Sequence, residues 1–413
     1  MAQMLAKLIA CDTCFPPGSS YQEFSDLVEL LFAPLGGSSE RVEVPAELWQ
    51  APNVTGRRVN LILRPDIGPA DAPEALIYFH TDTAPIGDGW TRPALELSVE
   101  GARLYGRGAA DMKGTIVSVF EALMRLRDRG AALAYRPVLA FCTDEEGGIY
   151  PGIRYLAETT KLPEILLNLN GSAEPRIWAG CLGSLDLELH LQGRTAHSGT
   201  PEKGINAVAA SAEVLVALKE FGQQLQARHT AMPPPPWAEG PLSAQLSVTA
   251  IHGGDKGSAI PGSCRVTINR RYLPEENPAT VIAEIKTLLD GVLKETPLVG
   301  WDLSEVGHLP PVSDPDGPAT DRWTQARAVA FDLPPSDFTR YGSGTSSDFG
   351  WVQQAGIQHM LLGGLSRPDR NVHAANEFTT FDDLIALSNA IENFFDATFH
   401  HDDPKGPKSP TFA

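Results

Sequence analysis

His80-Thr81-Asp82 follows directly on the apolar run at residues 75–79. That run predicts a buried strand, which would deliver an imidazole at its end and a carboxylate two residues later on the same side. A metal-bound histidine commonly donates its second ring N–H to a carboxylate, which sets its tautomer and orientation. The tripeptide alone also fits a structural histidine beside an unrelated acid. The metal interpretation therefore depends on further ligands elsewhere in the chain.

Acidic and histidine side chains recur in four other segments where a predicted strand runs into a turn. These segments contain Asp111 within residues 106–114, Glu145 and Glu146 within 143–148, Glu174 within 173–175, and His373 within 371–373. Each segment alone has an ordinary explanation, such as a helix cap, a solvated glutamate or a structural histidine. Taken together, these side chains come just after predicted buried strands. In open α/β sheets, ligand-binding sites form at this edge, beside the carboxyl ends of the strands.

Two histidines, one bridging aspartate and two further carboxylates form a set that can hold two divalent metal ions. Mixed imidazole and carboxylate ligands suit Zn²⁺, with Co²⁺ and Mn²⁺ as alternatives. Paired metal ions are a known device for hydrolysis. In Glu145-Glu146, a carboxylate that stands beside a metal ligand then fits a general base that takes a proton from metal-bound water.

Strands and helices alternate through the first half of the chain. Apolar runs at residues 59–63, 75–79, 136–142 and 165–168 predict strands, and helical spacing of apolar residues predicts a helix at 112–126. This alternation predicts a mostly parallel mixed sheet flanked by helices.

The pattern changes after about residue 180. Residues 184–192 alternate apolar and polar, and a β-α-β-β-α-β order follows through to about residue 306. We therefore expect a discontinuous metal-binding catalytic domain at 1–182 and 310–400, with an α+β split-βαβ sandwich inserted at 183–309. The tail at 401–413 is expected to be disordered.

Composition excludes several classes of protein. With 413 residues, 42% hydrophobic and 20% charged, the chain reads as a two-domain globular protein. No segment approaches the roughly 20 apolar residues that span a bilayer, and we find no secretory signal. The net charge of −18 argues against nucleic acid and anionic membrane as partners. Five scattered cysteines favour free thiols and a cytoplasmic location.

These motifs, in this order, resemble the co-catalytic zinc amidohydrolase and peptidase family of acetylornithine deacetylase, succinyl-diaminopimelate desuccinylase, aminoacylase and glutamate carboxypeptidase. The resemblance covers nearly the whole chain, and includes Thr195-Ala196-His197-Ser198 and Ile260-Pro261. It implies a zinc-exopeptidase-like fold, with the inserted sandwich serving as a dimerisation and lid domain.

The resemblance also implies residue roles. His80, Asp111 and Glu174 would hold one metal ion, and Asp111, Glu146 and His373 the other. Asp82 would orient His80, and Glu145 would be the general base and later the acid. On the inserted domain, His197 would polarise the scissile carbonyl of a neighbouring subunit, and Arg271 would bind a substrate carboxylate. Ordinary alternatives are a surface histidine and an exposed strand arginine.

Some positions depart from the family pattern or match it only loosely. Ser258 stands where the family commonly has asparagine beside the substrate carboxylate, and Ala173 replaces a glycine before Glu-Pro. The loop at residues 342–348, with Thr345, matches a family loop near the substrate, although a plain helix entry explains it equally well. The first departure leaves the choice of substrate open.

The sequence thus predicts a homodimeric cytoplasmic hydrolase that cleaves an amide C–N bond of an N-acyl amino acid or small peptide-like substrate. Metal-bound hydroxide, generated with Glu145 as the base, would be the nucleophile. A di- or carboxypeptidase, or a hydrolase of an unusual aryl amide or amine, is the alternative within the metallopeptidase and deacylase class. A non-catalytic zinc-binding protein on the same scaffold is the alternative outside it.

Overall fold

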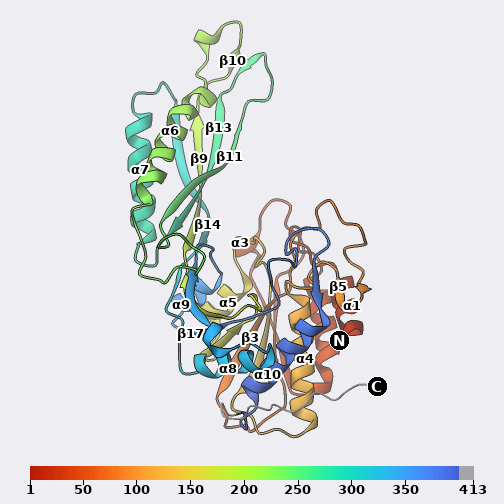
Figure 1. The fold of residues 1–413 in the computed structure, drawn as a ribbon. Coiled ribbons are helices and arrows are strands. Elements are labelled where there is room, and N and C mark those ends of the chain that lie inside the picture. Colours follow the sequence, from red (N-terminus) through yellow and green to blue (C-terminus); the bar gives the residue numbers. More distant parts are fainter. Residues whose placement is uncertain (400–413) are drawn as a thin grey trace. The chain divides into compact units, whose positions relative to one another are not determined.

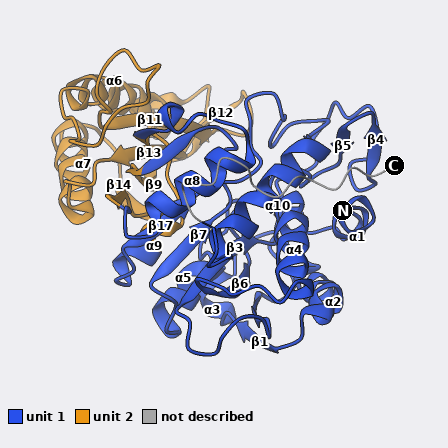
Figure 2. Cartoon of the chain, turned by 60° about the horizontal axis from the view of Figure 1, so that its bottom comes forward, with its two compact units in different colours: residues 1–178, 315–340, 352–413 blue, residues 179–314, 341–351 orange. Residues whose placement is uncertain are grey.

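A six-stranded mixed sheet is the centre of the larger of two compact units in the computed structural model, which describes residues 1–399 (Figure 1). The larger unit comprises Met1–Trp178, Pro315–Arg340 and the described residues from Val352 onward, and the smaller comprises Ala179–Asp314 and Tyr341–Trp351 (Figure 2). The predicted tail at 401–413 lies outside the described residues.

The large sheet has the order β1-β2-β6-β3-β7-β17. Its strands are β1 (Ser38–Glu43), β2 (Val59–Arg64), β6 (Arg136–Cys142), β3 (Glu74–His80), β7 (Ile165–Asn168) and β17 (His359–Leu362). The four strands β6, β3, β7 and β17 are parallel, whereas β1 and β2 are antiparallel to their neighbours. The predicted mostly parallel sheet is therefore confirmed.

β3 lies at the point where the strand order reverses. After β3, the chain passes to β6 on one side and then returns to β7 on the other side of β3. In open α/β sheets, ligands bind at such a switch point, beside the carboxyl ends of the strands. β3 ends at His80, so the fold places the first predicted ligand at this position.

Helices and short strands complete the larger unit. These elements are α1 (Ala2–Ala10), α2 (Tyr21–Phe32), η1 (Ala33–Leu35), α3 (Ala46–Trp49), β4 (Ser98–Glu100), β5 (Arg103–Tyr105), α4 (Lys113–Asp128), α5 (Gly152–Thr159), α8 (Thr320–Ala330), η3 (Pro335–Asp337), β18 (Phe378–Thr380) and α10 (Phe381–Phe395). None of the described helices is long and apolar enough to cross a membrane.

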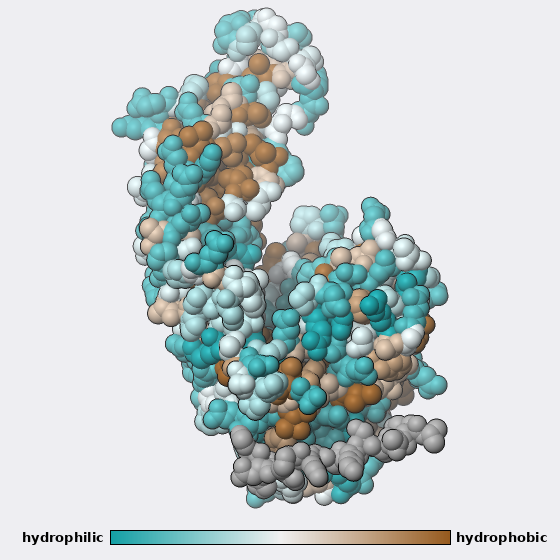
Figure 3. All heavy atoms as spheres, viewed as in Figure 1, coloured by the Kyte–Doolittle hydropathy of each residue, from teal (hydrophilic) through white to brown (hydrophobic). Residues whose placement is uncertain are grey.

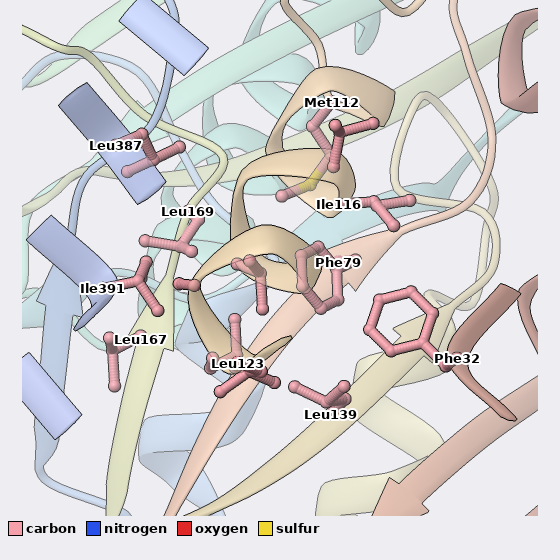
Figure 4. Packing of buried hydrophobic residues seen from close by; sticks show 14 of the residues in the cluster. Phe32, Phe79, Met112, Ile116, Leu123, Leu139, Leu167, Leu169, Leu387 and Ile391 are labelled. Carbon is pink, nitrogen blue, oxygen red and sulfur yellow. The ribbon is translucent and has the colours of Figure 1, made fainter. Parts of the chain in front are cut away.

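The core of the larger unit lies between the sheet and α4, with α10 packed beside α4. Figure 4 shows Phe79 and Leu139 from the sheet, Ile116 and Leu123 from α4, and Ile391 from α10 in this layer. All five side chains are fully buried. Because α4 begins at Lys113, two residues after Asp111, its packing also determines where that carboxylate lies.

The smaller unit is a four-stranded antiparallel sheet with the order β11-β13-β9-β14. In chain order its elements are β9 (Gly183–Gln192), β10 (Ala196–His197), η2 (Pro201–Lys203), α6 (Ala207–Leu225), β11 (Gln245–Gly253), β12 (Ala259–Ile260), β13 (Ser263–Tyr272), α7 (Pro278–Leu293), β14 (Gly300–Leu309) and β15 (Val312–Ser313). The predicted β-α-β-β-α-β order is confirmed. Alternate residues of β9, including Leu185 and Leu191, pack against α6 and α7.

Three elements, β8 (Arg176–Cys181), β16 (Thr339–Ser343) and α9 (Phe349–Gln354), straddle the borders between the two units. The segment Tyr341–Trp351 belongs to the smaller unit, although it follows residue 310 in the chain. Backbone hydrogen bonds explain this placement, because Ser343 accepts from Leu182 and Gly342 donates to Pro233. Sequence pattern shows no such pairing, because the partners are more than 100 residues apart.

All five cysteines are free thiols, and three of them are buried. The cytoplasmic location that their scatter favours stays a prediction.

Candidate metal centre

The carboxyl ends of three neighbouring parallel strands supply most of the predicted site residues of the larger unit. β3 ends at His80, β6 ends just before the turn that carries Glu145 and Glu146, and β7 ends six residues before Glu174. These strands are almost entirely buried, as their unbroken apolar sequences require. The polar side chains are therefore concentrated where the strands stop.

Four of the predicted ligands contact one another. His80 Nε2 lies 2.9 Å from Asp111 Oδ1, and His373 Nε2 lies 3.1 Å from Asp111 Oδ2 and 2.9 Å from Glu146 Oε2. Donor atoms of His80, Asp111 and Glu146 all lie within 4.8 Å of one another. The two oxygens of Asp111 thus face two different imidazoles, which is the arrangement that a bridging carboxylate requires.

The electrostatics of this cluster favour positive charge. Burial alone would lower the pKa of His80, but the bond to Asp111 and nearby carboxylates raise this pKa well above its ordinary value. Hydrogen bonds to Asp111 and Glu146 raise the pKa of His373 to about 10. For Asp111, burial would raise the pKa, but the bonds from His373 and His80 bring it well below its usual range. The cluster therefore stabilises a cation.

This donor set fits divalent metal ions. Imidazole nitrogens and carboxylate oxygens bind Zn²⁺ at about 2.0–2.2 Å, so donors that lie about 3 Å apart can share one ion. The two carboxylates, Asp111 and Glu146, also supply negative charge that offsets part of the charge of a divalent cation.

Glu174 is not among the donors that lie within 4.8 Å of one another. Its backbone N–H donates to Ser172 Oγ at 2.9 Å, and its carbonyl accepts from the buried guanidinium of Arg327. Arg327 also donates to the carbonyls of Ser172 and Arg176. The loop is thus anchored through its backbone, and the role of Glu174 as a ligand stays a prediction.

Asp82 contacts both His80 and the Glu146 turn. His80 Nδ1 lies 2.9 Å from the main-chain oxygen of Asp82 and 3.8 Å from its carboxylate Oδ1. The other carboxylate oxygen of Asp82, Oδ2, accepts the backbone N–H of Glu146 at 2.8 Å. Burial raises the pKa of Asp82 to about 7. The backbone carbonyl therefore makes the closer contact with the ring, while the carboxylate positions Glu146.

Glu145 has a neighbour that sequence reasoning missed. Asn170 Nδ2 donates to Glu145 Oε1 at 2.9 Å, and the backbone N–H of Asn170 donates to Asn168 Oδ1 at 3.0 Å. Asn170 comes two residues after the end of β7, so its position after a buried strand was the available signal. It orients one oxygen of the predicted base.

The turn before Glu145 is held by a buried ion pair, which the sequence analysis also missed. Arg58 Nε lies 2.7 Å from Asp144 Oδ2, and both side chains are about 1% exposed or less. The hydroxyl of Tyr21 donates to Asp144 Oδ1 at 2.9 Å, and the Arg58 guanidinium lies over Trp49. Asp144 has a φ of 63°, which is unfavourable for most side chains. These contacts hold the backbone that carries Glu145 and Glu146.

The predicted residues of the smaller unit fall into two places. His197 pairs with Ala259, and Ser198 donates to the carbonyl of Ser258, at the tip where Figure 1 labels β10. Arg271 lies near the other end of β13, about 26 Å from Ser263 at roughly 3.3 Å per residue.

At that other end, Arg271 contacts the loop that carries Thr345. Arg271 Nη1 donates to Ser346 Oγ at 2.6 Å, and Thr345 Oγ1 lies 2.8 Å from Ser343 Oγ. The structure therefore brings Arg271 and the Thr345 loop together but separates them from His197 and Ser258.

Comparisons with known proteins place this site in a family context. A family model described as peptidase family M20/M25/M40 matches residues 76–397. The chain is 30% identical over 204 residues to acetylornithine deacetylase from Klebsiella pneumoniae (strain 342), a match that covers 48% of this chain and 50% of that protein. The chain thus spans about half the length of this curated relative.

Solved structures share the fold. A di-peptidase from Saccharomyces cerevisiae has a TM-score of 0.74 at 17% identity, with 95% of this chain and 94% of that chain covered. An M20 family metallo-carboxypeptidase from Sulfolobus solfataricus has a TM-score of 0.73 at 18% identity, with 95% and 97% covered. At these identities the likeness establishes the fold alone.

Proposed function

This chain belongs to the peptidase family M20/M25/M40, and from that premise we propose that it is a dimetal hydrolase cleaving an amide C–N bond. The substrate class that we favour is an N-acyl amino acid or a small peptide-like molecule. The observation that carries the proposal is the contact cluster of two imidazoles and two carboxylates with Glu145, a further carboxylate, directly beside it in the chain.

Two divalent ions, with Zn²⁺ favoured over Co²⁺ and Mn²⁺, would share this centre. His80, Asp111 and Glu174 would hold one ion, and Asp111, Glu146 and His373 the other. When bound, such ions act as Lewis acids and make water a stronger nucleophile near neutral pH. The contacts of Asp111 with both histidines support its role as the bridge.

Glu145 is the proposed general base. Its carboxylate takes a proton from the attacking water as the new C–O bond forms at the carbonyl carbon. It then donates that proton to the nitrogen of the leaving amine as the C–N bond breaks. Asn170 supports this role, because its amide holds Oε1 of Glu145 in one orientation, and Asp82 keeps the adjacent Glu146 in place through its backbone.

Arg271, near Thr345, is the proposed anchor for a substrate carboxylate, and Ser258 is proposed as a further contact that would come from a second copy of the chain. Its planar guanidinium suits bidentate binding of a carboxylate. Nε of Arg271 donates to Asn269 Oδ1 at 3.1 Å, and this bond and the bond to Ser346 hold the guanidinium in place. A substrate with a free carboxylate beside the scissile amide fits this group.

We expect a panel of N-acetyl and N-succinyl amino acids and dipeptides, each assayed with Zn²⁺, Co²⁺ or Mn²⁺, to reveal amide hydrolysis. Substrates with a free α-carboxylate should exceed their methyl amides in kcat/KM by roughly tenfold to a hundredfold, the value of a charged hydrogen bond. Fastest turnover of dipeptides would favour the alternative, a di- or carboxypeptidase, and turnover of aryl amides alone would favour an unusual amide substrate. Absence of hydrolysis, with bound metal confirmed by elemental analysis, would instead favour a non-catalytic metal-binding protein.

We also infer a homodimer that forms through the smaller unit. β11 is an edge strand of the four-stranded sheet, and within the described residues its outer edge is unpaired. A groove of about 540 Å³ lies between α6 and β11, lined in part by Leu215, Leu246 and Val248. Figure 3 shows hydrophobic side chains gathered in the region where Figure 1 labels β9, β11 and β13. Such a surface suits a second copy of the chain.

This dimer would let His197 and Ser258 act on the substrate of the partner subunit. Their separation from Arg271 along β13 supports such an arrangement, because one site would then receive the two groups from different chains. His197 would polarise the carbonyl, and Arg271 would hold the carboxylate.

Sedimentation equilibrium is expected to give twice the chain mass of 44.4 kDa. Ile251→Arg, on the edge strand β11, should shift the mass toward the monomer because it introduces charge into the interface. Val306→Arg is a matched control, since Val306 is also 45% exposed but lies on the opposite edge strand, β14. A monomeric wild-type chain would contradict both the dimer and the role of His197 in the partner subunit.

A further inference from the structure

Glu377 is a buried carboxylate that the proposed chemistry does not use. It is 1% exposed and lies four residues after His373. Its Oε2 accepts from Arg107 Nη1 at 2.8 Å and from the backbone N–H of Gly108 at 3.1 Å. Its Oε1 accepts the backbone N–H groups of Ala110 at 2.9 Å and Asp111 at 3.0 Å. A buried carboxylate needs such partners, and here all four come from the loop that ends in Asp111.

The backbone of Glu377 adds to the same contact, because its carbonyl accepts the N–H of Gly106 at 3.0 Å. The loop from Gly106 to Asp111 is therefore folded around one residue of the His373 segment. The side chain and backbone of Glu377 together accept four backbone N–H groups of this loop, and so connect it to the His373 segment.

Arg107 extends this connection to a third loop. Its Nη2 donates to the carbonyls of Pro85 at 2.9 Å and Ile86 at 3.2 Å, just after His80 and Asp82. The guanidinium is 1% exposed and lies over the ring of Trp90 at 5.3 Å. The Arg107–Glu377 pair thus lies at the meeting point of three loops. One loop follows His80, one precedes Asp111 and one follows His373.

The His373 segment also needs external support. Asn371, His373 and Asn376 have φ values of 53°, 62° and 57°, in the left-handed region that non-glycine residues seldom occupy. Such backbone persists only where surrounding contacts over-determine it. Glu377 supplies these contacts at one end of the segment, and Asn376 Oδ1, which accepts from Thr91, supplies another.

We propose that Glu377 and Arg107 are positioning residues that set the separation between Asp111 and His373, and thereby the metal affinity of the centre. This inference rests on the proposed dimetal function. An ion pair with a purely structural role would change global stability but would leave metal affinity unchanged once the protein is folded.

Glu377→Gln tests this proposal, because the amide keeps the size of the side chain but turns an NH₂ group toward backbone donors. Calorimetric titration of Zn²⁺ into the metal-free full-length chain should show at least ~10-fold weaker binding, within the 10–100-fold range typical of groups that orient metal ligands. Excess Zn²⁺ should restore much of the lost kcat. Glu392→Gln is the matched control, since Glu392, on α10, pairs with Arg125 and Arg129 and its side chain is 15% exposed. The Zn²⁺ affinity of this variant should equal that of the wild type.

Arg107→Lys serves as the second variant if Glu377→Gln does not fold. A single ammonium keeps the charge but cannot bond Glu377 and both carbonyls in the geometry of the guanidinium, so Zn²⁺ affinity should again fall. Folded variants that bind Zn²⁺ as the wild type does, or an equal loss in Glu392→Gln, would overturn the inference. A wild-type chain that binds no metal would instead overturn the proposed function.

Hydrogen exchange of the unaltered chain gives an independent measurement. The amides of Gly108, Ala110 and Asp111 donate to a buried carboxylate and should be protected even without added metal. Rapid exchange across these residues in the metal-free chain would show that Glu377 does not hold the loop, and would overturn the inference even if neither variant folds.

Discussion

Replacing Glu145 with glutamine is expected to lower kcat by roughly 10²–10⁴-fold or more, the usual contribution of a general acid–base group. Glutamine keeps the shape of the side chain and can still contact Asn170, but it cannot accept the proton of the attacking water. Steady-state kinetics on the best amide substrate measures the loss of kcat, and elemental analysis measures the metal content. Metal content should be unchanged, because Glu145 is not among the proposed ligands.

The control for this variant is Glu164→Gln, which removes an exposed carboxylate just before β7. Its kcat should match that of the wild type. Near-normal turnover in Glu145→Gln would show that another group moves the proton, and the mechanism would be wrong. If Glu145→Gln lost metal as well as turnover, Glu145 would be a metal ligand and not the general base.

Asp111→Asn is expected to remove turnover and metal together. Both oxygens of Asp111 contact imidazoles, so the amide would place an NH₂ group where a second anionic oxygen now lies. Both proposed metal positions use this carboxylate, and we expect Zn²⁺ affinity to fall by at least ~100-fold, the upper end of what loss of a ligand-orienting group costs. Calorimetric titration of Zn²⁺ measures the affinity, and kinetics in excess Zn²⁺ measures what activity remains.

Asp128→Asn is the matched control, because Asp128 ends α4, the helix that begins just after Asp111, and its side chain is 60% exposed. This variant should retain the metal content and kcat of the wild type. Two equivalents of tightly bound Zn²⁺ in Asp111→Asn would exclude the bridging role. The contrast with Glu145→Gln, which should keep its metal, separates the binding of metal from the transfer of the proton.

Sequence pattern was sufficient for the architecture of both units. β3, β6 and β7 are short, unbroken apolar runs, and β9 alternates apolar and polar residues, so the two kinds of sheet differ in their local sequence. The fold class is confirmed for this reason, because periodicity is a local property. Small elements such as β18 and α3 have three or four residues, too few for a period to be recognised.

The sequence by itself also predicted which segments bring possible metal-binding side chains together. His80 ends a buried strand, Glu146 follows another, and Asp111 lies just before a helix. The structure brings these three side chains and His373 together. Parallel strands end at a common edge, so side chains that follow them are neighbours whatever their separation in the chain.

Only the tertiary structure revealed what holds these groups in place. In the sequence, Glu377 looks like an ordinary polar loop residue. Its carboxylate nevertheless accepts backbone N–H groups from residues that come 266 to 269 positions earlier in the chain. Arg58 and Asp144 are 86 residues apart, and Asn170 is 25 residues from Glu145. A carboxylate that accepts backbone N–H groups leaves no periodic trace, because its partners are peptide groups that every residue has. The types and order of the proposed site residues are thus properties of the sequence, whereas their support depends on long-range contacts that form only when the chain is folded.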